Sequence, residues 1–584
     1  MSVTLTEEQR AAIGARGQVI VSASAGSGKT FVMIERLVSL ILGGGDVRSI
    51  LAVTFTNKAA AQMRERLRLA LLKGIGEREG AEKERLKAQL AALPLAEIST
   101  IHAFCGRLIR TYFYAAGVDP AFRIAGGEDA ESAGLQARAL DAVFEEAYAQ
   151  KSPEFSLLLS AYFRKKKDAA LRNLVADLYR KARGLAGYRQ ILSEMGASDD
   201  FDAVCDYLAA DLRARADMVA RGLEERGHVY AALGEKFVAL SDMVHAVCTR
   251  IAAQDDLLCM RAVSGEADMA RMPVKRNASA EERAAIEFLS GAKKETSGML
   301  EELASYADRE TEHARCLQAN ALAHALGQLA LAYDDAYSRE KQEAGVLDYN
   351  DLEQIALQLL DNESVRSDLA ERYRAVFVDE YQDVNPVQEA ILSRLGGGEV
   401  FLVGDAKQAI YGFRGSRSEF FEEKEKLLPC SLRLSANFRS APAVLEATNE
   451  VLSAIAEGYV PMRGGERYGA HSGEVAFHLL PKRRAEESGA RGVYSVLEHA
   501  GAEKADALAD KVAQLVEEEL GSDWFDADAQ TVRKVGFGDI AVLTRRREGE
   551  AAHIARALLA RGIPVTTAAG VNVCDFFGAR LLID

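Results

Sequence analysis

A short stretch of small residues, glycines, a lysine and a threonine offers the clearest chemistry in the sequence. It lies between an apolar segment, QVIVS, and an amphipathic one, FVMIERLVSLI, and reads Ala23-Ser24-Ala25-Gly26-Ser27-Gly28-Lys29-Thr30. Small residues let successive backbone N–H groups curve around a phosphate, and a helix that begins there directs its positive end at the same point. Lys29 would reach the outer phosphates, and the Thr30 hydroxyl would bind Mg²⁺. Residues 24–30 are therefore predicted to bind a nucleotide, although Ala23 replaces the usual first glycine and such a turn can also be a plain tight connection.

A second candidate site is a pair of acids directly after an apolar run, in the segment VFVDEYQD. Asp379 would hold Mg²⁺, directly or through water, and Glu380 would orient and deprotonate an attacking water molecule. Acids at a strand end are also common as solvated turn residues. If both apolar runs belong to one parallel sheet, however, these acids and the phosphate loop lie at the same edge. The combination predicts a site for ATP and Mg²⁺.

The elements that would position these residues alternate between apolar strands and amphipathic helices over residues 1–118, as in parallel sheets with helical crossovers. Residues 119–370 change to long helical patterns and are predicted to form a helical insertion. Strand patterns return over residues 371–465, so the sheet is expected to close across the insertion. Residues 466–584 contain GEVAFHLL, GDIAVLTRR and IPVTTAA, which we expect to be strands at the start of a second, incomplete unit. The predicted class is α/β, a P-loop NTPase parallel sheet with a large all-helical insertion.

Composition narrows the class of protein. The 584 residues are 48% hydrophobic and 27% charged, which is typical of a soluble, helix-rich protein of several domains. The amino terminus lacks the layout of a secretory signal and no apolar run reaches the roughly 20 residues that span a bilayer, so we expect a cytosolic protein. The net charge of −15 argues against a surface covered with basic residues, although a motor that slides on DNA needs only a local groove. The seven cysteines are expected to be reduced and mostly buried thiols: Cys105, Cys205, Cys248, Cys259, Cys316, Cys430 and Cys574.

An ordered series of motifs resembles the UvrD/Rep group of superfamily-one helicases. In chain order the matching segments are LTEEQRAAI, SASAGSGKT, TFTNKAAAQM (54–63), TIHAFC (100–105), LDYNDL (347–352), DEYQD (379–383), VGDAKQAIYGFRG (403–415) and LSANFRS (434–440). The resemblance implies RecA-like domains and 3′ to 5′ movement on single-stranded DNA driven by ATP hydrolysis. LDYNDL, AKQAIYGFRG and FGDIAVLTRRR look more like the AddA/RecB branch of helicase-nuclease subunits than like stand-alone UvrD.

The resemblance also implies roles around the nucleotide. Gln9 matches the glutamine that reads adenine, and Phe438 matches the aromatic residue that stacks on it. Gln408 would sense the terminal phosphate and link it to the DNA groove. Arg439 would reach the γ-phosphate and stabilise charge that develops during phosphoryl transfer.

The same motifs imply a path for DNA. Tyr411 and Phe413 follow Gln408 in one loop, and stacking of bases on their rings contributes about 1 to 3 kcal/mol per base without regard to sequence. Outside such a motif both rings would be interpreted as core aromatics. The other residues assigned to the DNA path by resemblance are Thr54, Thr56, Asn57, Lys58, His102 and Phe104. His102 can equally be a structural histidine.

Two basic features have alternative interpretations. Arg414 could serve the site or could pair with an acid such as Asp405. The run Arg164-Lys165-Lys166-Lys167 could touch DNA phosphates or could form a solvated helix face.

Together these features predict an ATP-dependent DNA helicase, an AddA-like subunit of a helicase-nuclease for double-strand-break repair. Its expected partners are DNA ends and an AddB-like nuclease-helicase protein. The family's later motifs and a nuclease segment do not occur before Asp584, so we expect a fragment that binds ATP but hydrolyses and unwinds poorly alone. The alternatives are a stand-alone UvrD/Rep-like repair helicase, a non-catalytic, nucleotide-gated DNA-binding module and a small-molecule P-loop kinase.

Overall fold

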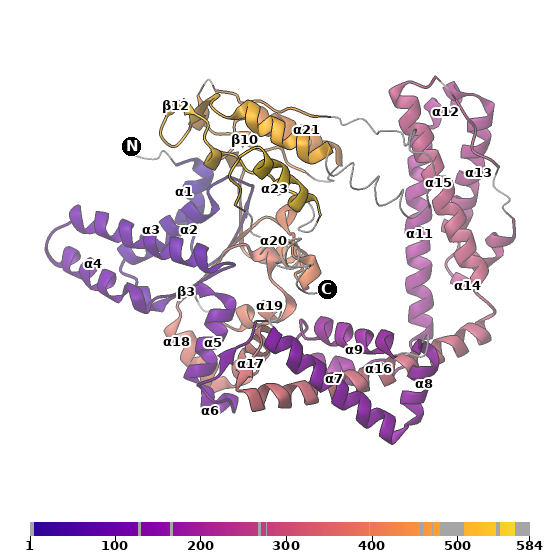
Figure 1. Ribbon diagram of the computed structural model, residues 1–584, viewed down its shortest axis with the longest axis horizontal. Helices are drawn as coiled ribbons and strands as arrows, with labels where there is room; N and C mark the ends of the chain where they lie inside the picture. The colour runs from indigo at the N-terminus through magenta and orange to yellow at the C-terminus, as the bar shows by residue number, and fades with distance from the viewer. Residues whose placement is uncertain are drawn as a thin grey trace.

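The centre of the molecule is a six-stranded, all-parallel sheet with the order β3-β2-β6-β7-β1-β8 (Figure 1). The computed structural model describes residues 5–126, 130–163, 168–266, 270–275, 277–395, 398–455, 459–469, 471–478, 507–544 and 549–566. The strands of the sheet are β1 (Gln18–Ala23), β2 (Ile50–Thr54), β3 (Glu97–Thr100), β6 (Ala375–Val378), β7 (Glu399–Gly404) and β8 (Cys430–Leu434). Strands from before and after the insertion pair directly, so the predicted α/β class with a parallel sheet is confirmed.

Helices cover both faces of this sheet. One face carries α1 (Glu7–Gly14), α2 (Lys29–Leu42), α3 (Asn57–Gly76) and α4 (Gly80–Ala92); the other carries α5 (Ile101–Thr111), α17 (Tyr349–Asp361), α18 (Glu363–Arg372), α19 (Pro386–Arg394) and α20 (Glu419–Leu427). Alternate strand residues enter opposite cores: Val19 and Val21 pack with the first group of helices, and Ile20 packs with the second. Strands buried on both faces need this nearly continuous apolar run.

The insertion is a set of helices with two separate cores. The helices α7 (Ala130–Gln150), α8 (Pro153–Tyr162), α9 (Ala169–Ala182) and α10 (Tyr188–Glu194) pack along the long α16 (Arg309–Ala344). A second bundle, apart from the sheet in Figure 1, contains α11 (Phe201–Glu225), α12 (Gly227–Leu233), α13 (Glu235–Ala252), α14 (Leu257–Arg261) and α15 (Ala280–Ser305). None of the described helices combines the length and apolar character that crossing a lipid bilayer requires.

The insertion begins and ends at a short parallel pair of strands, β4 (Arg123–Ile124) and β5 (Val346–Leu347). The sequence-based boundaries, residues 119 and 370, placed α17 and α18 inside the insertion. In the structure both helices pack against the sheet, because the apolar side chains of α17 and α18 join the same buried cluster as α5 and α19. This difference matters below because α17 lies next to residues of the candidate site.

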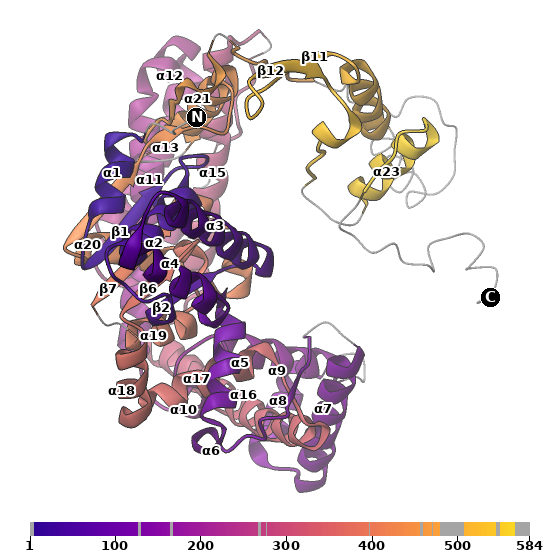
Figure 2. The same ribbon diagram turned by 90° about the vertical axis from the view of Figure 1, so that its left-hand side faces the viewer.

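The carboxy-terminal segment differs from the predicted second α/β unit. Its described part contains β9 (Ala436–Asn437) paired with β10 (Arg463–Gly464), α21 (Pro442–Ile455), an antiparallel hairpin of β11 (Asp523–Asp526) and β12 (Thr531–Lys534), a helix over 507–519, and α23 (Glu550–Ala560). The described residues of GEVAFHLL, GDIAVLTRR and IPVTTAA form no strand. An apolar pattern alone does not make a strand, because its backbone N–H and C=O groups also need a neighbouring strand as partner. Figure 2 shows the hairpin and α23 apart from the sheet.

Some predictions fall on residues that lie outside the described part of the chain. These are the basic run 164–167, Cys574 and the side chain of Arg414. The six described cysteines are free thiols, of which Cys105, Cys205 and Cys248 are buried. The expectation that most cysteines are buried therefore holds for half of those described.

Candidate nucleotide-binding site and aromatic loop

The phosphate loop connects β1 to α2 with a backbone that only glycine adopts easily. Gly26 and Gly28 have φ of 71° and 86°, in the left-handed region that disfavours side chains. A Cβ on Gly26 would lie 2.7 Å from the Cβ of Arg439, so the loop is also closely packed against the NFRS motif. The Ser27 hydroxyl is buried without a hydrogen-bond partner among the described residues. This loop has the small side chains and the unused donor that a bound phosphate group needs.

The lysine of this loop meets an acid and an amide from two other strand ends. Lys29 Nζ lies 2.9 Å from Glu380 Oε2 and 3.4 Å from Gln408 Oε1. The strand order explains the meeting: β7 pairs with β1 on one side and with β6 on the other, so the loops that follow the three strands lie at one edge. The structure thus brings together the sequence motifs on which the nucleotide-site prediction depends.

The two acids after β6 have different environments. The Asp379 side chain is largely buried and its residue is 9% exposed, while the Glu380 carboxylate is partly exposed and pairs with Lys29. Burial, and next the nearby Glu380 charge, raise the pKa of Asp379 to about 6. Glu380 has a φ of 52°, which costs a non-glycine residue roughly 1 to 2 kcal/mol. Such strain is typical of functional sites, where the surrounding structure holds a side chain in one direction.

The burial of Asp379 should reduce the stability of the metal-free protein. Because its folded-state pKa is raised from 3.8 to about 6, the ionised form is disfavoured on folding, and the penalty is fully present above pH 6 and disappears as the pH falls toward 4. We therefore expect Asp379→Asn to stabilise the protein at pH 8, by up to about 3 kcal/mol from a shift of roughly two pKa units.

Urea unfolding in the presence of a chelator, at pH 8 and at pH 5, measures this difference. The gain should shrink at the lower pH. Asp361→Asn, at an exposed position, is the matched control and should change little. Equal effects of Asp379→Asn at both pH values would contradict the assignment of the penalty to ionisation.

A buried glutamine that the sequence analysis did not single out links these motifs. Gln382 is 1% exposed; its amide nitrogen donates to Glu380 Oε2 at 2.8 Å and its oxygen accepts from the Asp405 backbone N–H at 3.0 Å. Asp405 in turn accepts from the side chains of Gln408, at 2.8 Å, and Lys407. Gln382 therefore orients the carboxylate of Glu380 and anchors the loop that carries Gln408. Its place inside DEYQD was the available signal.

Gln9 lies against the phosphate loop with both ends of its amide engaged. Its nitrogen donates to the Ser27 carbonyl at 3.1 Å, and its oxygen accepts from the backbone N–H of Thr6 at 3.2 Å. The second bond belongs to the capping box that begins α1. If this amide reads adenine, as the resemblance implies, at least one of these bonds must be replaced by a bond to the base.

Asn437, which the sequence analysis also left without a role, fastens the NFRS motif to the phosphate loop. Its amide donates to the Ala25 carbonyl at 2.7 Å, and its oxygen accepts from the backbone N–H of Arg439 at 2.9 Å. The backbone N–H of Phe438 donates to the Gly26 carbonyl at 2.9 Å. These bonds hold Arg439, whose side chain is exposed, beside the loop that is expected to bind phosphates.

The loop after Gln408 carries exposed aromatic rings. Tyr411 stacks on Phe55, with ring centroids 4.6 Å apart and an interplanar angle of 28°, and the Phe413 ring lies 6.0 Å from that of Tyr411. Phe413 is 80% exposed, so it is not a core aromatic residue. The sequence analysis missed Phe55, although an aromatic residue between two threonines at a strand end was a usable signal. The three rings form a group that we call the aromatic loop cluster.

A family model described as the UvrD/REP helicase N-terminal domain matches residues 5–429, a span that includes the phosphate loop, the acids and the aromatic loop cluster. The chain belongs to the UvrD/REP helicase family. Similar curated relatives include an ATP-dependent helicase/nuclease subunit of the A type from Pelotomaculum thermopropionicum, 31% identical over 97% of this chain and 50% of the relative. The equivalent protein of Bacillus licheniformis is 32% identical over 93% of this chain and 47% of the relative. The chain spans about half the length of the curated relatives it matches, and the resemblance inferred from the motifs is confirmed.

The first DNA-path motif surrounds the start of α3. Thr56 is the N-cap of this helix and its hydroxyl accepts from the Ala59 N–H, while Asn57 and Lys58 are exposed in its first turn. The backbone N–H groups of a helix start and an adjacent lysine suit a phosphate oxygen. Thr54 is buried and its hydroxyl donates to the Thr56 carbonyl at 3.1 Å, so it supports this turn from inside.

The second DNA-path motif requires a correction. Phe104 is 2% exposed and packs edge-to-face against Tyr373 in the core beneath the sheet, so its ring is not available to stack on DNA bases. The amphipathic period of α5 directs this residue inward, although its motif neighbour His102 remains partly exposed. The His102 Nε2 lies 2.9 Å from Glu353 Oε1, so this histidine has both a partner and an accessible side.

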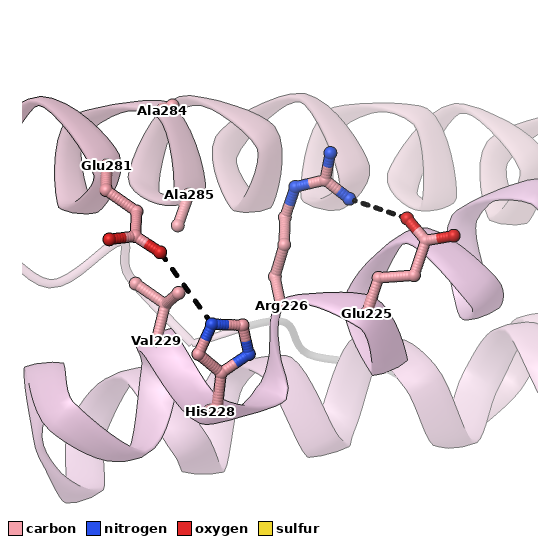
Figure 3. A pocket seen from close by; sticks show the side chains of 7 residues that line it. All are labelled: Glu225, Arg226, His228, Val229, Glu281, Ala284 and Ala285. Atoms are coloured by element: carbon pink, nitrogen blue, oxygen red, sulfur yellow. Dashed lines mark hydrogen bonds and ion pairs between the residues drawn. The ribbon is translucent and has the colours of Figure 1, made fainter.

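A cavity of about 330 Å³ lies far from this chemistry, where α12 meets α15 in the insertion (Figure 3). It is lined by Glu225, Arg226, His228, Val229, Glu281, Ala284 and Ala285. Its charged groups pair with one another, Arg226 with Glu225 and His228 with Glu281. The nucleotide assignment therefore rests on the sheet edge, where strand ends and charges converge, and not on this cavity.

Proposed function

We propose that this chain is the ATP-binding motor part of a DNA helicase, within an AddA-like protein of a helicase-nuclease complex. The observation that carries the proposal is the meeting of Lys29, Glu380 and Gln408 at the carboxyl edge of the sheet. The loop of Gln408 continues into Tyr411 and Phe413, so one loop joins the nucleotide site to exposed rings. The relatives are named as subunits, which supports a multi-protein complex, and we propose an AddB-like partner, a role at double-strand breaks and movement 3′ to 5′.

The residues at the sheet edge fit ATP with Mg²⁺. Thr30 and the buried Asp379 would hold the metal ion, an oxygen-ligand set that suits it, and Ser27 and the loop amides would bind phosphate oxygens. Mg²⁺ would neutralise charge on the phosphates during hydrolysis. Glu380 would take a proton from the attacking water, and Arg439 would stabilise charge on the outer phosphate.

The Lys29–Glu380 ion pair implies a switch on nucleotide binding. For Lys29 to reach the phosphates it must leave Glu380, which frees this carboxylate to orient water. The same movement changes the environment of Gln408, whose amide nitrogen is held by Asp405. Because the aromatic loop cluster follows directly, this is the shortest covalent route from nucleotide to DNA.

Single-stranded DNA should stimulate ATP turnover if this proposal is right. The test compares Mg²⁺-dependent ATP hydrolysis by the full-length protein with and without an oligothymidylate strand. We expect stimulation of at least tenfold. Hydrolysis unaffected by DNA would support a P-loop enzyme of another class, and DNA binding without any hydrolysis would support a nucleotide-gated binding module.

Removal of the Phe413 ring should weaken DNA binding while sparing the nucleotide. Stacking contributes about 1 to 3 kcal/mol per base, so Phe413→Ala should lower single-strand affinity roughly 5- to 150-fold at fixed salt. Fluorescence anisotropy with labelled oligothymidylate measures this loss. Tyr207→Ala, which removes a ring 73% exposed on α11, is the control and should leave DNA affinity unchanged. An unchanged affinity in Phe413→Ala would contradict the stacking role.

A further inference from the structure

A buried carboxylate on α17 connects the segment after the magnesium motif with the DNA-path histidine. Glu353 is 2% exposed. Its Oε1 accepts from Gln388 Nε2 at 2.6 Å and lies 2.9 Å from His102 Nε2, while its Oε2 accepts from Asn385 Nδ2 at 2.9 Å. A buried carboxylate with three donors is well satisfied, and its donors come from two different motifs.

Both ends of this connection are tied to the site. Asn385 is the N-cap of α19 and is separated from DEYQD by a single residue, so its position depends on the turn that holds Asp379 and Glu380. His102 lies in the first turn of α5, directly after β3, and its ring also contacts that of Tyr349 at 4.7 Å. His102 is partly exposed, so it presents a side to a ligand while its Nε2 faces Glu353.

The helix that carries Glu353 is fixed from its other side. Asp351 accepts from Lys341 Nζ at 2.6 Å and from Arg183 Nη2 at 2.7 Å, and all three side chains are buried. These partners belong to α16 and to the end of α9, in the insertion. A helix anchored by a buried ion-pair network cannot follow small local movements, so a change at Asn385 is transmitted to His102 rather than absorbed by α17.

We propose that Glu353 is a positioning residue that couples nucleotide binding to DNA binding, through Asn385 on one side and His102 on the other. The inference rests on the proposed function and adds a second route, separate from the Gln408 loop, between the two ligands. Coupling between two binding sites is reciprocal and is measured as a ratio of affinities. A purely structural role would change the affinities without changing their ratio.

The test replaces Asn385 by serine, which is an equally good N-cap but is too short to reach Glu353. The affinity for labelled oligothymidylate is measured with and without a non-hydrolysable ATP analogue and Mg²⁺, and the ratio is the coupling factor. We expect a factor of about 5 or more in the unchanged full-length protein. Asn385→Ser and Glu353→Gln should bring it to within about twofold of 1, and the double variant should go no further.

The matched control is Asn362→Ser, the same substitution at the N-cap of α18, where the side chain caps Ser364 and is exposed. It should keep the full coupling factor. Full coupling in Asn385→Ser, equal loss of coupling in Asn362→Ser, or no coupling in the unchanged protein would each overturn the inference. Absence of binding of both ligands to the unchanged protein would instead overturn the proposed function. Should Glu353→Gln not fold, Asn385→Ser and its control decide the question.

Discussion

Replacement of Lys29 by alanine is expected to abolish measurable ATP binding. In this structure its ammonium group bonds Glu380 and Gln408, and with nucleotide bound the same donors would face phosphate oxygens. Hydrogen bonds to charged groups contribute about 1.5 to 3 kcal/mol each, so the loss of two corresponds to a decrease in affinity of roughly 100-fold or more. The removal also leaves Asp379 and Glu380 without the nearby positive charge, which adds to the repulsion of the triphosphate.

Titration with a fluorescent ATP analogue in the presence of Mg²⁺ measures this effect. Lys58→Ala serves as the control because Lys58 is exposed at the start of α3 and belongs to the proposed DNA path. It should keep nucleotide affinity and lower DNA affinity in a salt-dependent way. Nucleotide binding by Lys29→Ala within about threefold of the unchanged protein would place the phosphates elsewhere.

Replacement of Glu380 by glutamine is expected to stop hydrolysis while keeping nucleotide bound. A general base contributes about 10²- to 10⁴-fold to turnover, and glutamine cannot accept the proton. The Lys29–Glu380 ion pair at 2.9 Å competes with the triphosphate for the lysine. Because glutamine holds the lysine less strongly than a carboxylate does, the affinity for ATP should stay equal or increase.

Steady-state turnover and nucleotide affinity of the full-length protein, both with saturating single-stranded DNA, separate these effects. Glu371→Gln, at an exposed position of α18, should change neither quantity. A Glu380→Gln protein that keeps more than about a tenth of the turnover would assign the base to another residue. Weaker ATP binding by the same variant would show that the ion pair does not compete with the nucleotide.

Local sequence determined the chemistry of this protein because the relevant groups are set by residue type and by the backbone beside them. Gly26, Gly28 and Lys29 define a phosphate loop wherever they follow a strand and begin a helix, and the apolar run before Asp379 already places this acid at a strand end. The parallel sheet and the helical character of the insertion followed from the same short-range patterns.

Tertiary structure decided which of these groups meet and which side of each element they face. Strand order places β7 between β1 and β6, and no local pattern specifies that order. The packing of α5 buries Phe104, whereas the loop after β7 leaves Phe413 exposed and stacks Tyr411 on Phe55. The strands expected near the carboxyl end did not form in its described part, because a strand needs a partner that periodicity does not supply.

The connection through Glu353 illustrates the same division. The motif that contains Asp351 was visible in the sequence, but its neighbour Glu353 acquired a role only when α17 packed between α5 and α19. Hydrogen bonds between residues far apart in the chain depend on the position of whole elements. Residue types therefore determined what each side chain can do, and the packing of the sheet and its helices determined with which partners it does so.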